Sequence, residues 1–260
     1  MEENTHITKK TKIIIAAAVS VAVLIVAIVC GIVFSRKERE LTTQEWLDKF
    51  SLSMESALSV KDEDGNVLPV NVMREIEIEA DGSVVATYRQ SLQTFTVDGQ
   101  VEAYLLSEEK YPALESEQDN VTEEYYLYQN VMYTSRLCAG EKQISHFDSN
   151  VDTLLQVAKE NIGENKYNFD EGNFSPIEEG AGIVAHEKDV HRICAKIATD
   201  KYAAFFGKDV EGLSNMTVTM QMNGDVFEYF TLEYEENGIK TKVKITRYDA
   251  KTVTKPQWLE

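Results

Sequence analysis

Two hydrophobic patterns divide the chain. Residues 13–34 form a run of 22 residues without one charged side chain. A helix of that length reaches about 33 Å and can cross the hydrocarbon core of a bilayer. Beyond residue 40, short stretches alternate between apolar and polar positions, which is the period of a half-buried strand. The pattern predicts one transmembrane helix from Ile13 to Phe34, followed by a domain rich in strands.

The alternating stretches are separated by pairs such as Asp-Gly and Asn-Gly, which favour tight hairpin turns. A period of 3.6 residues predicts helices over 41–60, 150–162 and 200–213. The predicted strands span 75–80, 84–97, 101–106, 125–128, 131–137, 183–198, 217–222, 226–234 and 239–245.

The last three predicted strands form an antiparallel meander. In the middle one, Val226, Phe230, Leu232 and Tyr234 share the face that we expect to be buried. One face of such a meander is in water and helices must cover the other. We therefore predict an α+β fold: a curved antiparallel sheet covered by helices on one face and preceded by one transmembrane helix.

Domain boundaries follow from these patterns. We assign 1–12 to a cytoplasmic tail, 13–34 to the transmembrane helix, 35–40 to a linker of basic and acidic residues, and 41–260 to one extracytoplasmic α+β domain. Three basic residues flank the apolar run on each side, so the positive-inside count alone does not orient it. A lysine-bearing tail directly before an apolar run is typical of an uncleaved signal anchor. We expect a single-pass protein of the cell membrane with its N-terminus inside and its domain outside.

Two other readings of the apolar run are a cleaved signal peptide and a lipoprotein signal ending at Cys30. The run is too long for the first and lacks a cleavage site of small residues. Lipidation is disfavoured because the apolar run continues from Gly31 to Phe34.

Charge limits the partners of the domain. The chain has 44 acidic and 26 basic residues, a formal net charge of −18. Such a surface repels phosphate backbones, so we expect no nucleic-acid partner.

The 125–130 sequence YYLYQN, followed by Tyr133-Thr134-Ser135, is similar to a hairpin of exported lipoproteins. The closing stretch 216–250, followed by Pro256, also resembles the final meander of the carrier and cell-surface lipoprotein group typified by LolA. The resemblance implies a lipoprotein-like domain of the bacterial cell envelope, a half-barrel with an apolar cavity. The candidate wall residues of that cavity are Met220, Met222, Phe230 and Leu232. Apolar stripes of this kind more often belong to an ordinary hydrophobic core than to a ligand pocket.

Two motifs resemble metal sites. His186 and His191 enclose an HEKDVH sequence, but five positions separate them rather than the four of a zinc-protease helix. In one strand they would point to opposite faces. The acidic loop 62–66 lacks the glycine and glutamate positions of a calcium-binding EF-hand. We therefore expect no metal site and no cofactor.

Cys138 and Cys194 are the only thiols outside the apolar run. If the domain is exported they could form a disulfide, whereas the alternative is two free, half-buried cysteines. No histidine arrangement supports a catalytic cysteine.

Taken together, these features predict a membrane-tethered, extracytoplasmic binding or interaction module with no enzymatic activity. Its partners would be the bilayer, through Ile13 to Phe34, and a protein or an apolar ligand. The alternative is a binder of lipid or another apolar ligand with the LolA-like half-barrel. A second alternative is a hydrolase whose site has no recognised motif.

The predicted orientation can be tested on intact cells. A protease added outside should degrade the domain while a cytoplasmic control protein survives, because the domain would face the exterior. Immunoblotting of both proteins measures the outcome. Survival of the domain until the cells are lysed would reverse the orientation.

Overall fold

The computed structural model describes residues 41–112, 120–162, 167–249 and 252–259. Thr43–Glu260 forms one compact unit. The predicted transmembrane helix over 13–34 lies outside the described residues. Among the helices that are described, none has the length and hydropathy to cross a membrane.

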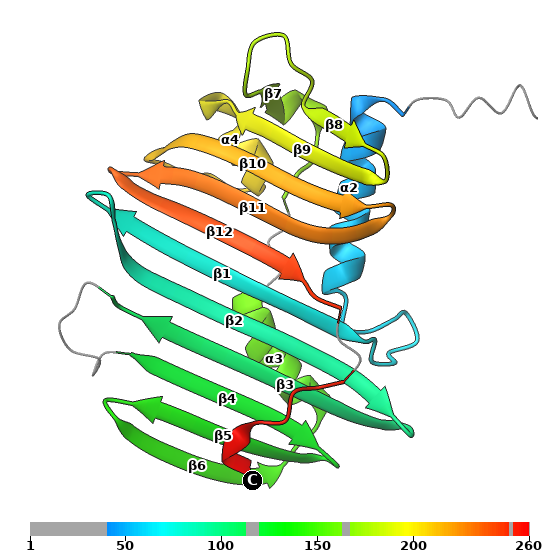
Figure 1. The fold of residues 1–260 in the computed structure, drawn as a ribbon, viewed down its shortest axis with the longest axis vertical. Helices are drawn as coiled ribbons and strands as arrows, with labels where there is room; N and C mark the ends of the chain where they lie inside the picture. The colour runs from blue at the N-terminus through cyan, green and yellow to red at the C-terminus, as the bar shows by residue number, and fades with distance from the viewer. Residues whose placement is uncertain (1–40, 113–119, 163–166, 250–251, 260) are drawn as a thin grey trace, which may run out of the picture. The chain divides into compact units, whose positions relative to one another are not determined.

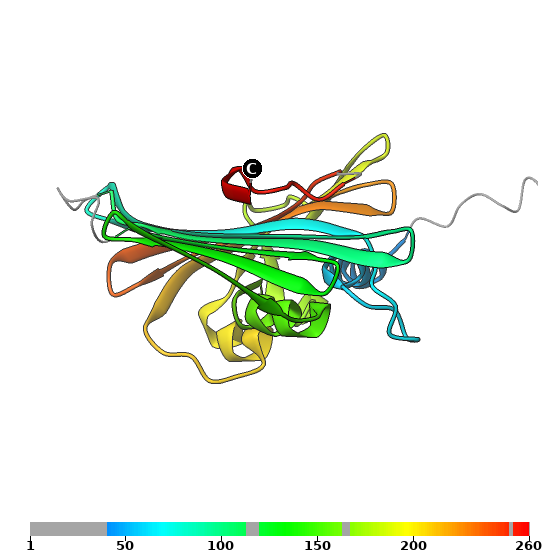
Figure 2. The same ribbon diagram turned by 90° about the horizontal axis from the view of Figure 1, so that it is seen from below.

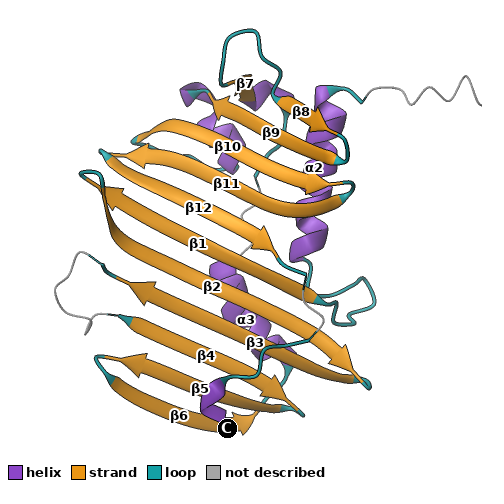
Figure 3. Cartoon of the chain, viewed as in Figure 1, coloured by secondary structure: helices purple, strands orange, loops and turns teal. Residues whose placement is uncertain are grey.

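A single antiparallel sheet of 12 strands dominates the unit (Figures 1 and 3). Its strands are β1 (Val70–Ala80), β2 (Ser83–Val97), β3 (Gln100–Lys110), β4 (Val121–Tyr128), β5 (Val131–Cys138), β6 (Glu141–Asp148), β7 (Phe174–Pro176), β8 (Val184–Glu187), β9 (Val190–Ile197), β10 (Leu213–Asn223), β11 (Val226–Glu236) and β12 (Ile239–Arg247).

The strand order is β6-β5-β4-β3-β2-β1-β12-β11-β10-β9-β7, with β8 also paired to β9. Consecutive strands β1 to β6 form one meander, and β9 to β12 form a second. The two meanders meet where β1 pairs with β12. The antiparallel sheet predicted from the alternation is confirmed, and the described part of the chain is mostly β, with three short helices.

The three helices lie on one face of the sheet, and the C-terminal segment 252–259 lies on the other (Figure 2). The helices are α2 (Thr43–Leu58), α3 (Val151–Ile162) and α4 (Tyr202–Phe206). We call the side with the helices the helix-covered face and the side with the C-terminal segment the open face.

The hydrophobic core lies between the helices and the sheet. Leu47 and Phe50 of α2 are fully buried, and the helix packs on β1, β10 and β11. A second cluster forms where Leu154 and Leu155 of α3 pack on β1 to β5. Helical spacing places these side chains on one stripe of each helix, and burying that stripe stabilises both the helix and the strands beneath it.

Charged residues line the junction of the two meanders on the open face. The three glutamates that alternate along β1 lie directly opposite three lysines of β12, which also alternate. The register pairs Glu75 with Lys244, Glu77 with Lys242 and Glu79 with Lys240. Opposite charges at facing positions of an antiparallel pair favour this register.

Several sequence predictions of local structure were wrong. The predicted strand over 183–198 is a hairpin of β8 and β9, which turns at Lys188 and Asp189. The predicted helix over 200–213 ends at Phe206, because Gly207 adopts a left-handed φ of 64° that terminates it. Strand β6 was not predicted, since all eight of its residues are exposed and apolar and polar positions do not alternate regularly.

Val226 was predicted on the buried face of β11 and is 48% exposed. The register shifts near Glu228, so that Gln221 faces Tyr229 while Met222 faces Phe227. This β-bulge exchanges the two faces of the strand, and Phe227 is buried in place of Val226. The predicted C-cap Gly163 of α3 lies outside the described residues.

Substitutions in β11 test this architecture. Phe230 is fully buried and stacks on Tyr167 at 4.8 Å between ring centroids. Phe230→Ala should lower the free energy of unfolding by about 3–5 kcal/mol through lost burial and the cavity that remains. Glu233 lies on the open face beside Lys242 at 3.1 Å. Glu233→Ala should cost no more than about 1 kcal/mol, because exposed ion pairs contribute little. Urea denaturation measures both, and equal losses would contradict the strand assignment.

Candidate functional site

Aromatic side chains form a row across the open face at one end of the sheet. The register places Tyr104 of β3 opposite Tyr126 of β4, Tyr126 opposite Tyr133 of β5, and Tyr133 opposite His146 of β6. Because directly opposed residues of antiparallel strands point to the same face, the four rings are neighbours. The row exists only when β3 to β6 are assembled.

The rings contact one another in partly stacked arrangements. Tyr126 and Tyr128 lie two positions apart on β4, with ring centroids 6.3 Å apart and planes 12° apart. Tyr126 and Tyr133 are 6.4 Å apart, and Tyr133 and His146 are 6.1 Å apart. Offset aromatic pairs at these distances stabilise each other beyond simple burial. We call Tyr104, Tyr126, Tyr128 and Tyr133 the tyrosine cluster.

Two hydroxyl groups of the cluster bind carboxylates. Tyr104 donates to Glu124 at 2.8 Å, and Tyr126 donates to Glu102. Burial, together with these hydrogen bonds, raises the pKa of both Tyr104 and Tyr126 far above the ordinary phenol value. The two hydrogen bonds fix the positions of these phenol groups on the buried side of the cluster.

The C-terminal segment crosses over the cluster. The backbone N–H of Thr254 donates to Gln93 Oε1 at 2.8 Å, and Val253 is buried against Tyr104 and Tyr126. At the far end of the segment, the Lys142 ammonium of β6 lies 5.8 Å from the Trp258 ring. The segment thus connects β2 to the edge strand β6.

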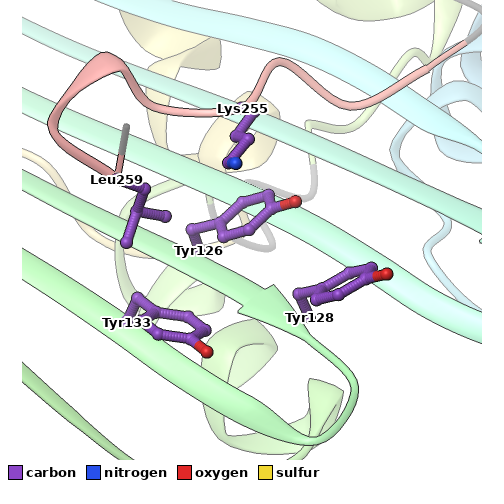
Figure 4. Close-up of a pocket in the computed structure, with 5 residues that line it drawn as sticks. All are labelled: Tyr126, Tyr128, Tyr133, Lys255 and Leu259. Atoms are coloured by element: carbon purple, nitrogen blue, oxygen red, sulfur yellow. The ribbon is translucent and has the colours of Figure 1, made fainter.

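A cavity of about 400 Å³ lies beside this segment (Figure 4). Its walls are Tyr126, Tyr128 and Tyr133 from the sheet, and Lys255 and Leu259 from the C-terminal segment. Tyr128 is 44% exposed, so its ring is available to a molecule from solution. The cavity offers aromatic faces, phenol hydroxyls and one ammonium group, which is a surface suited to partly apolar side chains.

The edge strand β6 borders the tyrosine cluster. Among the described strands it pairs only with β5, so its outer backbone N–H and C=O groups face solvent. Ile144 on the open face and Phe147 on the helix-covered face are 57% and 47% exposed. An exposed edge with apolar side chains can pair with another chain.

The opposite edge of the sheet is built differently. Beyond β9, the sheet ends in β7, of three residues, and β8, of four. Strand β7 ends at Pro176, which has no N–H to donate. Short edge strands and proline prevent pairing with other chains. Only the β6 edge therefore presents a strand of eight residues.

The candidate wall residues of an apolar cavity lie in the core. Met220, Met222 and Phe230 are fully buried and Leu232 is 1% exposed, all in the cluster beneath α2 and α4. Strands β10 and β11 thus place the four side chains together. The cavity beside the C-terminal segment is lined by none of them.

The two cysteines are free and far apart. Cys138 is in β5 and Cys194 is in β9, with seven strands between them in the sheet order. Eight strand spacings of about 4.8 Å separate them by roughly 38 Å. A disulfide requires Cα atoms within about 7 Å, so these two cannot pair within this fold.

The acidic loop 62–66 closes on itself. Asp62 accepts hydrogen bonds from the backbone N–H and the side-chain amide of Asn66, at 2.8 and 2.9 Å. These bonds lower the pKa of the Asp62 carboxyl. The carboxylate thereby stabilises the turn.

His186 and His191 lie differently from the expectation. They are not on opposite faces of one strand but face each other across the β8–β9 hairpin. The sequence interpretation treated 183–198 as one strand and so missed the turn between them. The pKa of His191 is lowered by burial and by its neighbours His186 and Lys49.

From the sequence, Tyr125 to Tyr128 and Tyr133 were noted only for their similarity to a hairpin of exported lipoproteins, and no site was predicted there. Tyr104 and strand β6 were missed altogether. The signal in the sequence was Gly140, because glycine readily adopts the positive φ that the turn between β5 and β6 requires. Compared with known proteins, the chain matches no family model and no curated sequence.

The hydrogen bond from Tyr104 to Glu124 can be tested by stability. Tyr104→Phe should lower the free energy of unfolding by about 1–2 kcal/mol, because a buried donor to a carboxylate is lost. Tyr128→Phe is the matched control and should change it by no more than about 0.5 kcal/mol, since that hydroxyl is exposed. Thermal or urea unfolding measures both.

The same variant predicts a pH effect. A raised phenol pKa stabilises the fold fully below about pH 10, the ordinary phenol value, and this stabilisation is lost as the pH rises toward the higher folded value. Tyr104→Phe should therefore lose less stability above pH 10 than the wild type. An unchanged alkaline dependence would show that Tyr104 does not contribute to it.

Proposed function

We propose that this protein is a membrane-tethered, extracytoplasmic interaction module that binds an extended segment of a partner protein along β6. The observation that carries the proposal is the asymmetry of the sheet edges. One edge ends in short strands and a proline, whereas β6 leaves eight residues unprotected. An added strand would satisfy the outer backbone groups of β6, which is how extended peptides bind to many sheet edges.

The tyrosine cluster supports this surface. Tyrosines contribute large, rigid and amphipathic contact area at little entropic cost, and they are enriched in protein interfaces. Tyr133 and the exposed Ile144 lie on the open face of neighbouring strands, next to the cavity. A partner that pairs with β6 could place its side chains over Ile144 and reach the cavity with a neighbouring segment.

The membrane anchor belongs to the same proposal. The apolar run from Ile13 to Phe34 would hold the domain at the cell membrane, with the N-terminus inside. With a net charge of −18, the chain favours a neutral or basic partner over an acidic one. The proposed role includes no catalytic step.

The alternative of a LolA-like half-barrel for an apolar ligand has less support. It needs open space beside Met220, Met222, Phe230 and Leu232, and these side chains are packed in the core. The likeness of 216–250 to that group remains the argument for it. Organic extraction of the purified protein followed by mass spectrometry separates the two functions, because only a carrier would yield a stoichiometric lipid.

Site-specific photo-crosslinking tests the interaction surface. A photoreactive amino acid at Ile144, in living cells, should give one discrete crosslinked product, because this side chain would contact the partner. The matched control is Ile239, which is 43% exposed but belongs to an interior strand paired on both sides. Gel electrophoresis and mass spectrometry identify the product.

The outcomes differ clearly. A product formed from position 144 and not from position 239, and lost in the additional variant Phe147→Lys, supports partner binding along β6. A product with twice the mass of the chain would mean that the edge binds a second copy instead. Equal products from both positions, or none from either, would overturn the proposal.

A further inference from the structure

The β8–β9 hairpin brings two histidines together at the other end of the sheet. His186 and His191 are directly opposed in the register, and Lys188 takes a positive φ of 55° in the two-residue turn that connects the strands. His191 in turn lies opposite Met222, a core residue of β10. Both imidazoles therefore belong to the helix-covered face, at its edge.

The ring nitrogens of the pair converge. Nδ1 of His186 and Nδ1 of His191 are 3.0 Å apart. The rings are held there by Trp46 of α2, whose centroid is 4.6 Å from His186 and 4.3 Å from His191. An aromatic neighbour on both rings restricts their rotation, so the two nitrogens keep facing one another.

At this distance one imidazole can donate a hydrogen bond to the other, and the same spacing fits two ligands of one metal ion. With metal–nitrogen bonds of about 2.0–2.1 Å, two ligands at right angles are about 2.9 Å apart, and two at the tetrahedral angle are about 3.3 Å apart. The observed 3.0 Å lies between these values. An ion bound by both nitrogens would require each ring to turn its Nδ1 lone pair toward the ion.

We propose that His186 and His191 form a binding site for a divalent transition-metal ion, of the class of Cu²⁺, Ni²⁺ or Zn²⁺, through their two Nδ1 atoms. Imidazole nitrogen is a preferred ligand of these ions. The near right angle favours the tetragonal geometry of Cu²⁺ and Ni²⁺. No group of three or more His, Cys, Asp or Glu side chains in the described parts of the chain could hold a metal. Water would complete the coordination, which makes the site open and exchangeable.

The charges around the pair are of both signs. Burial, His186 and the Lys49 ammonium lower the pKa of His191, but the ammonium also forms a salt bridge with Asp225 at 2.5 Å. Asp189 and Asp225 contribute negative charge near His191. Binding would link β8 to β9 across the hairpin, beside Trp46 of α2.

Copper titration of the purified full-length protein in detergent tests the site. Trp46 lies against both imidazoles, so bound Cu²⁺ should quench its fluorescence in a saturable way. His186→Gln and His191→Gln should each weaken binding at least about tenfold, since each removes one of two ligands. His146→Gln on β6 is the matched control and should bind like the wild type. A large excess of Zn²⁺ should displace Cu²⁺ and restore the fluorescence, because Zn²⁺ binds such sites more weakly.

Electron paramagnetic resonance of the wild type loaded with one equivalent of Cu²⁺ gives a readout that needs no variant. Coupling to two nitrogen atoms is expected. Coupling to one nitrogen or to none would overturn the proposal, as would unchanged copper affinity in both histidine variants. Circular dichroism of the variants distinguishes loss of a ligand from loss of the fold.

Discussion

The pairing of β1 with β12 is the contact on which the rest of the sheet depends. It joins the meander formed by β1–β6 with the strands of the C-terminal half, so that 12 strands form one hydrogen-bonded sheet. On the helix-covered face Ile76 lies opposite Val243, and on the open face Glu77 lies opposite Lys242. A shift by one residue would bring the glutamates of β1 to the core side. The hydrophobic effect and the charge pattern therefore favour the same register.

The two faces of the sheet have different roles because only one carries helices. Burial of Leu47 and Phe50 from α2, and of Leu154 from α3, stabilises the covered face. The open face presents charged ladders in its centre and the tyrosine cluster near β6. Apolar and aromatic groups remain accessible there because the C-terminal segment covers only part of the cluster. This difference in covering confines the proposed partner-binding surface to one end.

The two proposed sites lie near opposite edges of one sheet. The β6 edge is long and unprotected, whereas the edge beyond β9 is short and ends with the histidine hairpin. The first would bind through backbone groups and aromatic side chains, and the second through two ring nitrogens. Both depend on register, since each site is made of side chains that face one another across neighbouring strands.

Local features of the sequence determined much of this fold. Alternation along 75–80 and 217–222, and the turns at Asp81-Gly82, Asp98-Gly99 and Asn237-Gly238, predicted strands and hairpins, because side-chain period and turn geometry are properties of a few adjacent residues. The antiparallel sheet and most of its strands followed from these features alone. The single-pass anchor and its orientation remain predictions from the run at 13–34.

Only the tertiary structure decided what depends on distant partners. Strand β6 has no buried side chain of its own and is held by its pairing with β5. The bulge at Glu228 reversed the faces of Val226 and Phe227, because packing against the helices outweighed simple alternation. The tyrosine cluster forms only when three strands pair in register. The histidine pair forms only when the chain turns at Lys188, and no glycine marks that turn in the sequence. Registers and bulges depend on the total free energy of the assembled sheet, so a short stretch of sequence cannot determine them.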